Sequence, residues 1–264
     1  MIKYGGNAMV NEQIRQSVMK DICTLHQSGK RVIVVHGGGP FINAILKTVK
    51  IESEFIGGHR KTTPEAMKYI EMTLIGEVNT GLVTVINQLG ARAVGLSGKD
   101  GRLAIASRRF HNENSENPVD LGLVGNVKKI DPTVLFDLLD KGYIPIVACV
   151  APDEAGKTYN INADMMAGAV AGAVGADHYC VLTDVDGLRM DKDDVASLID
   201  TLQYDELQPL FDKVIVGGMI PKIESCQIAL DHGAESARII NGTKENTLIR
   251  ALIEKQPTGT IISK

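Results

Sequence analysis

Short apolar runs and helical stripes of apolar residues alternate along most of the chain. Residues 11–28 show the spacing of a helix with one buried face. Their apolar positions are Ile14, Val18, Ile22 and Leu25. The next segment, residues 31–36, contains the uninterrupted apolar run Val32–Val35, which is typical of a strand buried on both faces. This first pair predicts a helix followed by a buried strand.

The same alternation continues to the end of the chain. The predicted helices are 11–28, 41–48, 64–89, 132–141, 162–176, 195–210, 222–232 and 247–254. The predicted strands are 1–4, 31–36, 91–96, 143–150, 178–184, 237–241 and 260–262, with hairpins at 52–62 and 103–129 and a polar turn at 153–159. Repeated strand–helix units predict an α/β fold in which helices cover both faces of a mainly parallel sheet.

Glycine-rich turns follow two of the predicted strands. Gly5 and Gly6 come directly after Lys3, and Gly37–Gly39 come directly after the strand that ends at His36. Each glycine costs about 0.5–1 kcal/mol relative to alanine in ordered backbone. Backbone N–H groups that approach a phosphate at a helix start explain this cost better than ordinary turns do, although a plain turn remains the alternative at Lys3. We interpret His36 as a structural histidine.

Polar residues mark three further positions. Asn160 and Asp164 lie where a loop meets a helix, and Asn162 between them is a good N-cap, so a simple capped helix is an equal alternative there. Residues 183–188 (TDVDGL) follow a strand, and residues 216–222 (VGGMIPK) deliver a lysine to a helix start. Ligands bind at the carboxyl ends of strands in parallel sheets, so these segments are expected to converge.

Composition narrows the function. The chain has 264 residues, 44% hydrophobic and 23% charged, a formal net charge of −4 and few aromatics, which disfavours nucleic acid as a partner. The four cysteines are far apart and show no zinc spacing. No signal peptide or membrane-spanning run is visible, so we expect a cytoplasmic protein with reduced thiols and no membrane partner.

Familiar catalytic motifs are missing from the sequence. There is no GxxxxGK[ST] phosphate loop, no GxGxxG dinucleotide fingerprint and no GxSxG nucleophile. What remains is a set of glycine turns, two lysines beside glycines and an aspartate at a helix start. This inventory suits phosphoryl transfer, in which catalysis is mostly positioning and neutralisation of charge.

Six motifs in order carry a resemblance that spans the chain from residue 3 to its C-terminus. They are KYGGNAM, VVHGGGP, GGHRKTT, YNINAD, LTDVDGL and GGMIPK. Together they resemble the amino acid kinase family. The resemblance implies a three-layer αβα sandwich that transfers the γ-phosphate of ATP to a carboxylate. Within the family, the motifs are most similar to the branch whose acceptor is N-acetyl-L-glutamate, in arginine biosynthesis.

The resemblance also implies roles for individual residues. Lys3 and Lys222 would stabilise the transferring phosphoryl group, and Asp164 would organise the two lysines. The implied acceptor-binding residues are Gly38, Gly39, Arg60 and Asn160. The implied nucleotide-binding residues are Gly5, Gly6, Thr183, Asp184, Gly187, Leu188, Gly217 and Met219. Mg²⁺ would be carried by ATP, without protein ligands.

Organisation and assembly follow from the same resemblance. Residues 1–175 would form an acceptor-binding lobe and residues 176–264 an ATP-binding lobe of one continuous kinase domain. The helix at 64–89 would form a homodimer interface. Arginine-inhibited relatives carry an extra helix before the first strand, whereas here the strand starts at Met1. We therefore expect a dimer that is insensitive to arginine.

Alternatives remain at this point. A sibling kinase acting on acetylaminoadipate would use the same chemistry on an acceptor one methylene longer, and one methylene is worth only about 1–3 kcal/mol of discrimination. A nucleotide-binding sensor without turnover would not need both lysines and Asp164. An oxidoreductase on a Rossmann sheet is disfavoured by the missing fingerprint.

Overall fold

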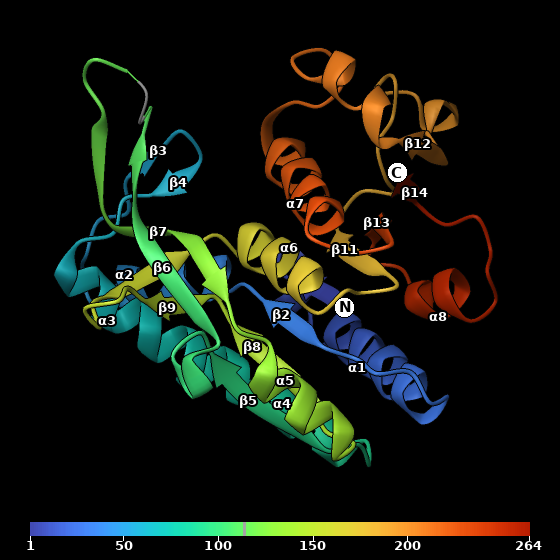
Figure 1. Ribbon diagram of the computed structural model, residues 1–264, viewed down its shortest axis with the longest axis horizontal. Coiled ribbons are helices and arrows are strands. Elements are labelled where there is room, and N and C mark those ends of the chain that lie inside the picture. The colour runs from blue at the N-terminus through green and yellow to red at the C-terminus, as the bar shows by residue number, and fades with distance from the viewer. Residues whose placement is uncertain (113–114) are drawn as a thin grey trace.

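An eight-stranded sheet runs through the centre of the computed structural model, which describes residues 1–112 and 115–264 (Figure 1). Its strands, from edge to edge, are β12 (Thr201–Gln203), β14 (Thr260–Ser263), β13 (Ser236–Asn241), β11 (Tyr179–Thr183), β1 (Ile2–Tyr4), β2 (Val34–His36), β8 (Ile144–Ala148) and β5 (Ala93–Ser97). The neighbouring strands from β13 to β5 are all parallel, and β14 pairs antiparallel with β13. The predicted mainly parallel sheet is confirmed.

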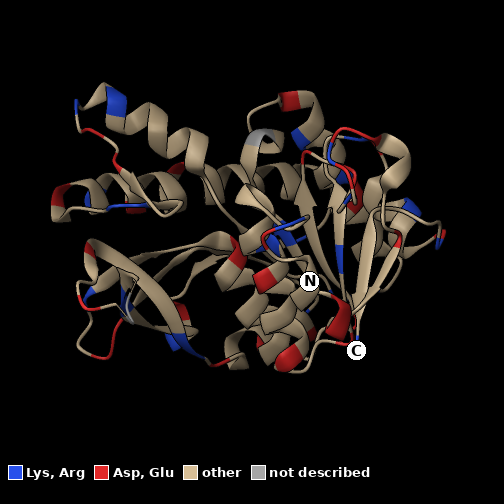
Figure 2. Cartoon of the chain, turned by 90° about the horizontal axis from the view of Figure 1, so that it is seen from above, with Lys and Arg blue, Asp and Glu red and all other residues tan. Residues whose placement is uncertain are grey.

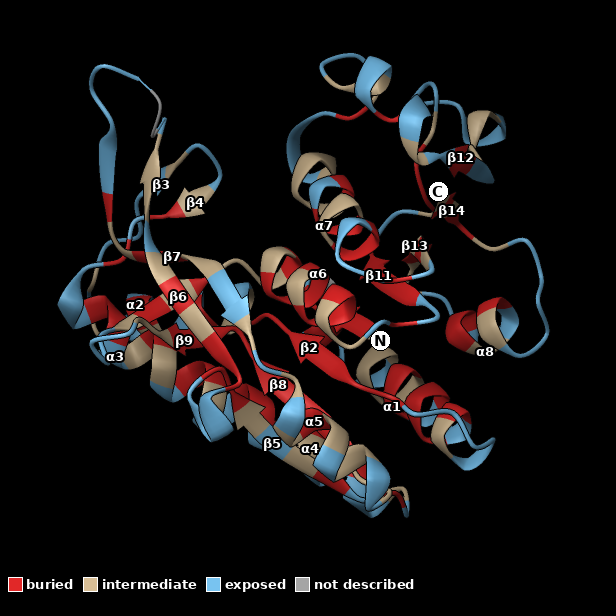
Figure 3. Cartoon of the chain, in the orientation of Figure 1, coloured by how far each residue is buried: buried red, intermediate tan, exposed pale blue. Residues whose placement is uncertain are grey.

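Helices cover both faces of this sheet. They are α1 (Glu12–Gln27), α2 (Gly39–Thr48), α3 (Pro64–Glu71), α4 (Thr80–Gln88), α5 (Thr133–Asp140), α6 (Ala163–Ala173), α7 (Ile220–Asp231) and α8 (Thr247–Leu252). Val34 packs with α1, α4 and α8 in one core, and the next residue, Val35, packs with α6 and α7 in the other. The central strands are buried on both sides, as Figure 3 shows. The αβα sandwich is therefore confirmed.

The first predicted helix shows how the apolar stripe becomes packing. Val18, Ile22 and Leu25 of α1 are buried, and Ile14 is partly buried. Each such side chain contributes about 1.5–3 kcal/mol when it leaves water. Asn11 caps the helix by accepting a hydrogen bond from Ile14 N.

Among the described helices, none is long and apolar enough to cross a bilayer.

A smaller sheet and a hairpin stand to one side of the large sheet (Figure 1). The small sheet contains β6 (Ala104–His111), β7 (Val119–Ile130), β10 (Thr158–Ile161) and β9 (Val150–Pro152), and the hairpin is β3 (Phe55–Ile56) and β4 (His59–Arg60). Both predicted hairpins are confirmed; residues 113 and 114 of the one predicted at 103–129 lie outside the described residues. Strand β10 was not predicted, because its start fell in the polar turn expected at 153–159.

Residues 64–88 form one continuous helical rod, as predicted. The rod consists of α3, a π-helical segment at Met72–Asn79, and α4. Asn79 ends the wide segment and points inward, where its Nδ2 donates to Ile146 O at 2.8 Å and lies 2.9 Å from His36 Nε2. Burial lowers the pKa of His36 to about 4, so the ring is neutral at pH 7 and accepts from Asn79. This confirms the structural interpretation of His36.

The predicted helix at 195–210 is wrong. Its apolar residues Val195, Leu198, Ile199 and Leu202 imitate a helical stripe. The chain instead forms short 3₁₀ turns at Val195–Ser197, Tyr204–Glu206 and Gln208–Leu210, with the edge strand β12 between the first two. The side chains of Asp194 and Glu206 bond nearby backbone N–H groups and close these turns locally. Local hydrogen bonds of this kind compete with a continuous helix.

The boundary expected near residue 175 falls between α6 and β11. Strand β11 pairs directly with β1 in parallel register, so the two proposed lobes share the large sheet. The cysteines Cys23, Cys149, Cys180 and Cys226 are buried and free.

Candidate functional site

Two adjoining cavities open at the edge where β1, β2 and β11 end. The first, which we call the Arg60 cavity, has a volume of about 340 Å³. It is lined by Lys3, Gly5, Gly6, Ala8, Gly39, Pro40, Asn43, Phe55, Arg60, Leu182, Thr183, Asp184 and Lys222. The second, which we call the Met219 cavity, has a volume of about 350 Å³. It is lined by Thr183, Asp184, Val185, Gly187, Leu188, Arg189, Lys192, Val214, Val216, Gly218, Met219 and Lys222.

Lys222, Thr183 and Asp184 belong to both cavities and form the wall between them. Thr183 ends β11, so the sheet itself brings this wall to its carboxyl edge. Lys222 lies in the first turn of α7, and its Nζ donates to Gly218 O at 3.2 Å. A ligand that extended through both cavities would therefore pass Lys222.

Lys3 and Asp164 form a buried ion pair at this junction. Lys3 Nζ lies 2.9 Å from Asp164 Oδ1, and their side chains are only 8% and 10% exposed. Asn162 caps α6 through Oδ1, which accepts from Asp164 N at 2.8 Å and from Met165 N at 3.3 Å, so the predicted cap fixes Asp164 at the helix start. The structure brings together residues that are far apart in the sequence.

The charges of this cluster depend on one another. Burial alone would raise the pKa of Asp164, but the charges of Lys3 and Lys222 outweigh it and lower that pKa. Burial lowers the pKa of Lys222, Asp164 opposes this effect, and Lys3 adds to it. An ionised aspartate thus pairs with Lys3 and acts on Lys222 through its charge, in a water-poor place where charge acts more strongly than in bulk water.

The glycine turns contribute in different ways. Gly5 and Gly6 line the Arg60 cavity, and a Cβ on Gly5 would lie 3.3 Å from Lys3 Nζ. Gly39 begins α2 and also lines this cavity, so a helix N-terminus faces it. Gly38 is not a lining residue. A Cβ there would lie 2.7 Å from Leu74, so packing against the helical rod accounts for this glycine.

Arg60 is a buried cation that several side chains hold in place. It sits on β4, where its terminal nitrogens donate to Ser53 Oγ and Asn43 Oδ1 and its guanidinium lies 4.5 Å from the centre of the Phe55 ring. Sequence reasoning found Arg60 but missed these partners. Two positions in the sequence could have indicated these partners. Asn43 lies one turn into α2 after Pro40, and Phe55 lies opposite Arg60 in the predicted hairpin.

Asn160 does not line either cavity. It lies on β10, where its Nδ2 donates to Thr62 Oγ1 at 3.4 Å. The hydroxyl of Thr62 donates to Arg60 O at 2.9 Å, so Asn160 reaches the Arg60 strand through Thr62. Its predicted contact with an acceptor stays a prediction.

Most of the predicted nucleotide-binding residues lie together in the Met219 cavity. Thr183, Asp184, Gly187, Leu188 and Met219 line it, as expected for one shared site. Gly217 lies just outside the lining, and its neighbour Gly218 takes that place. Sequence reasoning missed Arg189, Lys192 and Val214, and it gave no role to Val185, Val216 and Gly218 inside the predicted segments 183–188 and 216–222. The valines beside the 217–218 glycines were a usable signal of an apolar wall.

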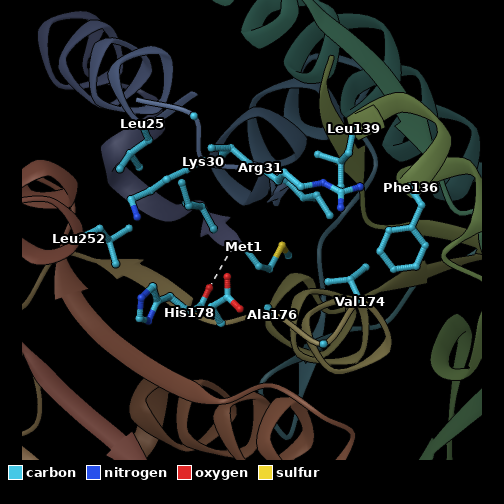
Figure 4. A pocket seen from close by; sticks show the side chains of 16 residues that line it. Met1, Leu25, Lys30, Arg31, Phe136, Leu139, Val174, Ala176, His178 and Leu252 are labelled. Atoms are coloured by element: carbon cyan, nitrogen blue, oxygen red, sulfur yellow. Dashed lines mark hydrogen bonds between the residues drawn. The ribbon is translucent and has the colours of Figure 1, made fainter. Parts of the chain in front are cut away.

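A further cavity of about 460 Å³ lies at the other end of the central strands, where β1, β2 and β11 begin (Figure 4). It is lined by residues such as Met1, Arg31, Phe136 and His178, and the Met1 amino group donates to His178 O at 2.9 Å. The glycine turns and Lys222 are at the other edge, so this cavity is separate from the candidate site.

Outside the two cavities, positively and negatively charged residues lie among one another along the chain (Figure 2). Lys and Arg residues are interspersed with Asp and Glu in the view of Figure 2. Within the described part of the chain, no group of three or more His, Cys, Asp or Glu side chains could hold a metal ion.

Known proteins resemble this chain in sequence and in fold. Residues 1–241 match the amino acid kinase family. The acetylglutamate kinase of Corynebacterium jeikeium is 45% identical over 99% of this chain and 82% of its own length, and that of Solidesulfovibrio magneticus is 46% identical over 99% and 89%. The Giardia carbamate kinase structure superimposes with a TM-score of 0.73 at 16% identity, covering 100% of this chain and 97% of its own, which is a likeness of fold. With its ordered glycine turns, its lysine pair and this match over most of its length, the chain belongs to the amino acid kinase family.

Proposed function

We propose that the protein is an acetylglutamate kinase, which transfers the γ-phosphate of MgATP to the side-chain carboxylate of N-acetyl-L-glutamate and forms N-acetylglutamyl 5-phosphate for arginine biosynthesis. Relatives that bear this name match almost the whole chain at 45% and 46% identity. The observation that carries the proposal is the cluster of Lys3, Asp164 and Lys222 beside the wall shared by two cavities.

Repulsion between anions is the main obstacle to this reaction. The acceptor carboxylate is ionised at pH 7 and must approach a triphosphate, so no general base is required. An oxygen of the carboxylate forms a bond to the γ-phosphorus as the bond to the β-phosphate oxygen breaks. Lys3 and Lys222 neutralise the charge that spreads over the phosphoryl oxygens, and Asp164 keeps the two lysines in place.

The two cavities suit the two substrates. We assign the acceptor to the Arg60 cavity, where the planar guanidinium can bind a carboxylate through two parallel hydrogen bonds. We assign the nucleotide to the Met219 cavity, whose valine, leucine and methionine side chains offer an apolar wall for a base. Mg²⁺ enters with ATP as part of the substrate. The γ-phosphate would then lie beside Lys222, between the cavities.

We also infer a homodimer through the helical rod at residues 64–88. Met72 on this rod is 67% exposed, and a second copy packed against the rod would bury it.

Detection of the acyl phosphate tests the proposed reaction. The purified chain, MgATP and hydroxylamine are incubated with N-acetylglutamate, acetylaminoadipate or glutamate, and the hydroxamate and ADP are measured. We expect product with N-acetylglutamate, and at least tenfold less with the other two acceptors. The variant Asp164→Asn serves as the control for contaminating kinases, and its signal should fall sharply. Equal product with acetylaminoadipate would reassign the acceptor, and no product with any acceptor would reject the proposed activity.

A further inference from the structure

Asp186 is a charged residue with three partners that the proposed reaction does not use. Its Oδ1 lies 2.5 Å from Lys244 Nζ and accepts from Asn241 Nδ2 at 2.9 Å. Its Oδ2 lies 3.2 Å from Arg189 Nη2. These contacts keep the pKa of Asp186 below its usual value, first through the hydrogen bond from Lys244. One carboxylate thus ties its own turn to the end of β13 and to the loop after it.

The turn that carries Asp186 separates two spaces. Asp184, Gly187, Leu188 and Arg189 line the Met219 cavity on one side. Asp186 itself lines a different cavity of about 250 Å³, together with Asn241, Lys244 and Arg250 among others. The carboxylate therefore holds the turn from behind, on the side away from the Met219 cavity.

A second contact anchors the same turn to β14. Leu188 N donates to Thr260 Oγ1 at 2.8 Å, and this bond is buried. Gly187 has φ +151°, and a Cβ there would lie 2.7 Å from the Thr260 hydroxyl. The backbone at this point is fixed closely to the sheet, and that of Arg189 pairs with Leu198 in an isolated β-bridge, so the contact with Asp186 fixes the Arg189 guanidinium.

Arg189 connects Asp186 to the Met219 cavity, because it contacts Asp186 and also lines that cavity. It lines the Met219 cavity, and its other terminal nitrogen donates to Lys192 O at 3.3 Å, in a residue that lines the same cavity. We propose that Asp186 is a positioning residue for nucleotide binding, which holds the Asp184–Arg189 turn and keeps Arg189 in the wall of the Met219 cavity. This proposal rests on the assignment of the nucleotide to that cavity.

The test compares nucleotide and acceptor affinity in the full chain. For Asp186→Asn we expect KM for ATP and the calorimetric Kd for MgADP to rise about tenfold, because several contacts of one turn weaken together. The kcat and the KM for N-acetylglutamate should stay within about twofold, a split that a general loss of structure would not produce. Arg189→Gln should raise the same two nucleotide constants, and the double variant should fall short of the product of the single effects.

Controls keep the test decisive. Asp231→Asn removes a carboxylate from another surface ion pair, with Lys264 at 3.4 Å, which lines neither cavity, and it should leave the nucleotide constants unchanged. If Asp186→Asn does not fold, Lys244→Met loosens the same tie from a half-exposed side chain and should raise Kd for MgADP about threefold.

The possible failures are separable. An unchanged Kd for MgADP in Asp186→Asn and Lys244→Met, or a parallel rise in the KM of both substrates, would overturn the positioning role. Binding of MgADP is measured without turnover, so a wild-type chain that fails to phosphorylate N-acetylglutamate would reject the proposed reaction while the calorimetry still decides on Asp186. A wild-type chain that does not bind MgADP would reject the positioning role as well.

Discussion

The Arg60 cavity and the Met219 cavity have nearly the same volume and share a wall, but different kinds of side chain line them. Buried cations form the first: Lys3 is 6% exposed and Arg60 is 9% exposed. Apolar side chains on loops form much of the second, and Val185 and Val216 there are 41% and 48% exposed. One cavity is a charged recess in the sheet edge, and the other is an apolar surface carried by turns.

This difference matches the ligands that we assign. A small acceptor with two carboxylates offers little apolar surface, so its binding must come from cations that are already desolvated and oriented. A nucleotide offers a large base, which exposed valines and a methionine can cover. Changes to the first cavity should therefore act through charge, and changes to the second through the position of loops.

Removal of the Lys3 charge should give the largest effect. For Lys3→Met we expect kcat to fall by about 10²–10³, the cost of losing one group that stabilises transition-state charge. The KM of either substrate should change by only a few-fold, because the Lys3 charge is already paired with Asp164 and acts mainly on the charge that develops in the transition state. Steady-state kinetics with both substrates varied measures this.

Lys128→Met is the matched control for that variant. Lys128 pairs with Glu154 at 2.9 Å, but both side chains are more than half exposed, and such pairs contribute roughly 0–1 kcal/mol. Its kcat should equal that of the wild type. A Lys3→Met enzyme that kept more than a fifth of its kcat would contradict the charge role of this residue.

Arg60→Lys should have a smaller effect that is confined to one substrate. Lysine keeps the charge but loses the planar fork, and it cannot donate to Ser53 and Asn43 in the same way. We expect KM for N-acetylglutamate to rise about tenfold and KM for ATP to stay within twofold. Arg31→Lys, at an exposed pair with Asp140, is the control. A parallel rise in the KM for ATP would show that the two cavities are not independent.

Much of the fold followed from local pattern. The stripe of α1 and the rod at 64–88 repeat a helical spacing over several turns, and the run Val32–Val35 before β2 ends is apolar throughout. The helix predicted at 195–210 was wrong because its apolar residues have helical spacing by chance. The edge strand β12 within it has only three residues, too few to show the alternation of a strand. Strand β10 was not predicted, because four residues beside a polar turn show almost no pattern of a strand.

The candidate site was predictable to a different degree in its two halves. Lys3 and Asp164 are 161 positions apart, and no local pattern predicts that contact; the ordered motifs did. Asn43 and Ser53 were missed because polar residues at such positions are ordinary on a surface. Asp186 was seen only as part of a glycine turn, since its partners Asn241 and Lys244 become visible only when β13 lies beside β11.

The pH dependence of kcat/KM for ATP should show the smallest effect, at the wall that both cavities share. Burial lowers the pKa of Lys222 in the free enzyme below the ordinary 10.5, so its charge, and with it kcat/KM, should be lost as pH rises through that lowered pKa. Asp164 opposes the shift and Lys3 adds to it. The alkaline midpoint should therefore move to lower pH in Asp164→Asn and to higher pH in Lys3→Met. Measurement of kcat/KM for ATP from about pH 7 to 10.5, with thermal unfolding checked at each pH, decides this. Midpoints that moved in the same direction in both variants would mean that a group other than Lys222 controls the alkaline limb, because the loss of the Asp164 charge lowers the pKa of Lys222 and the loss of the Lys3 charge raises it.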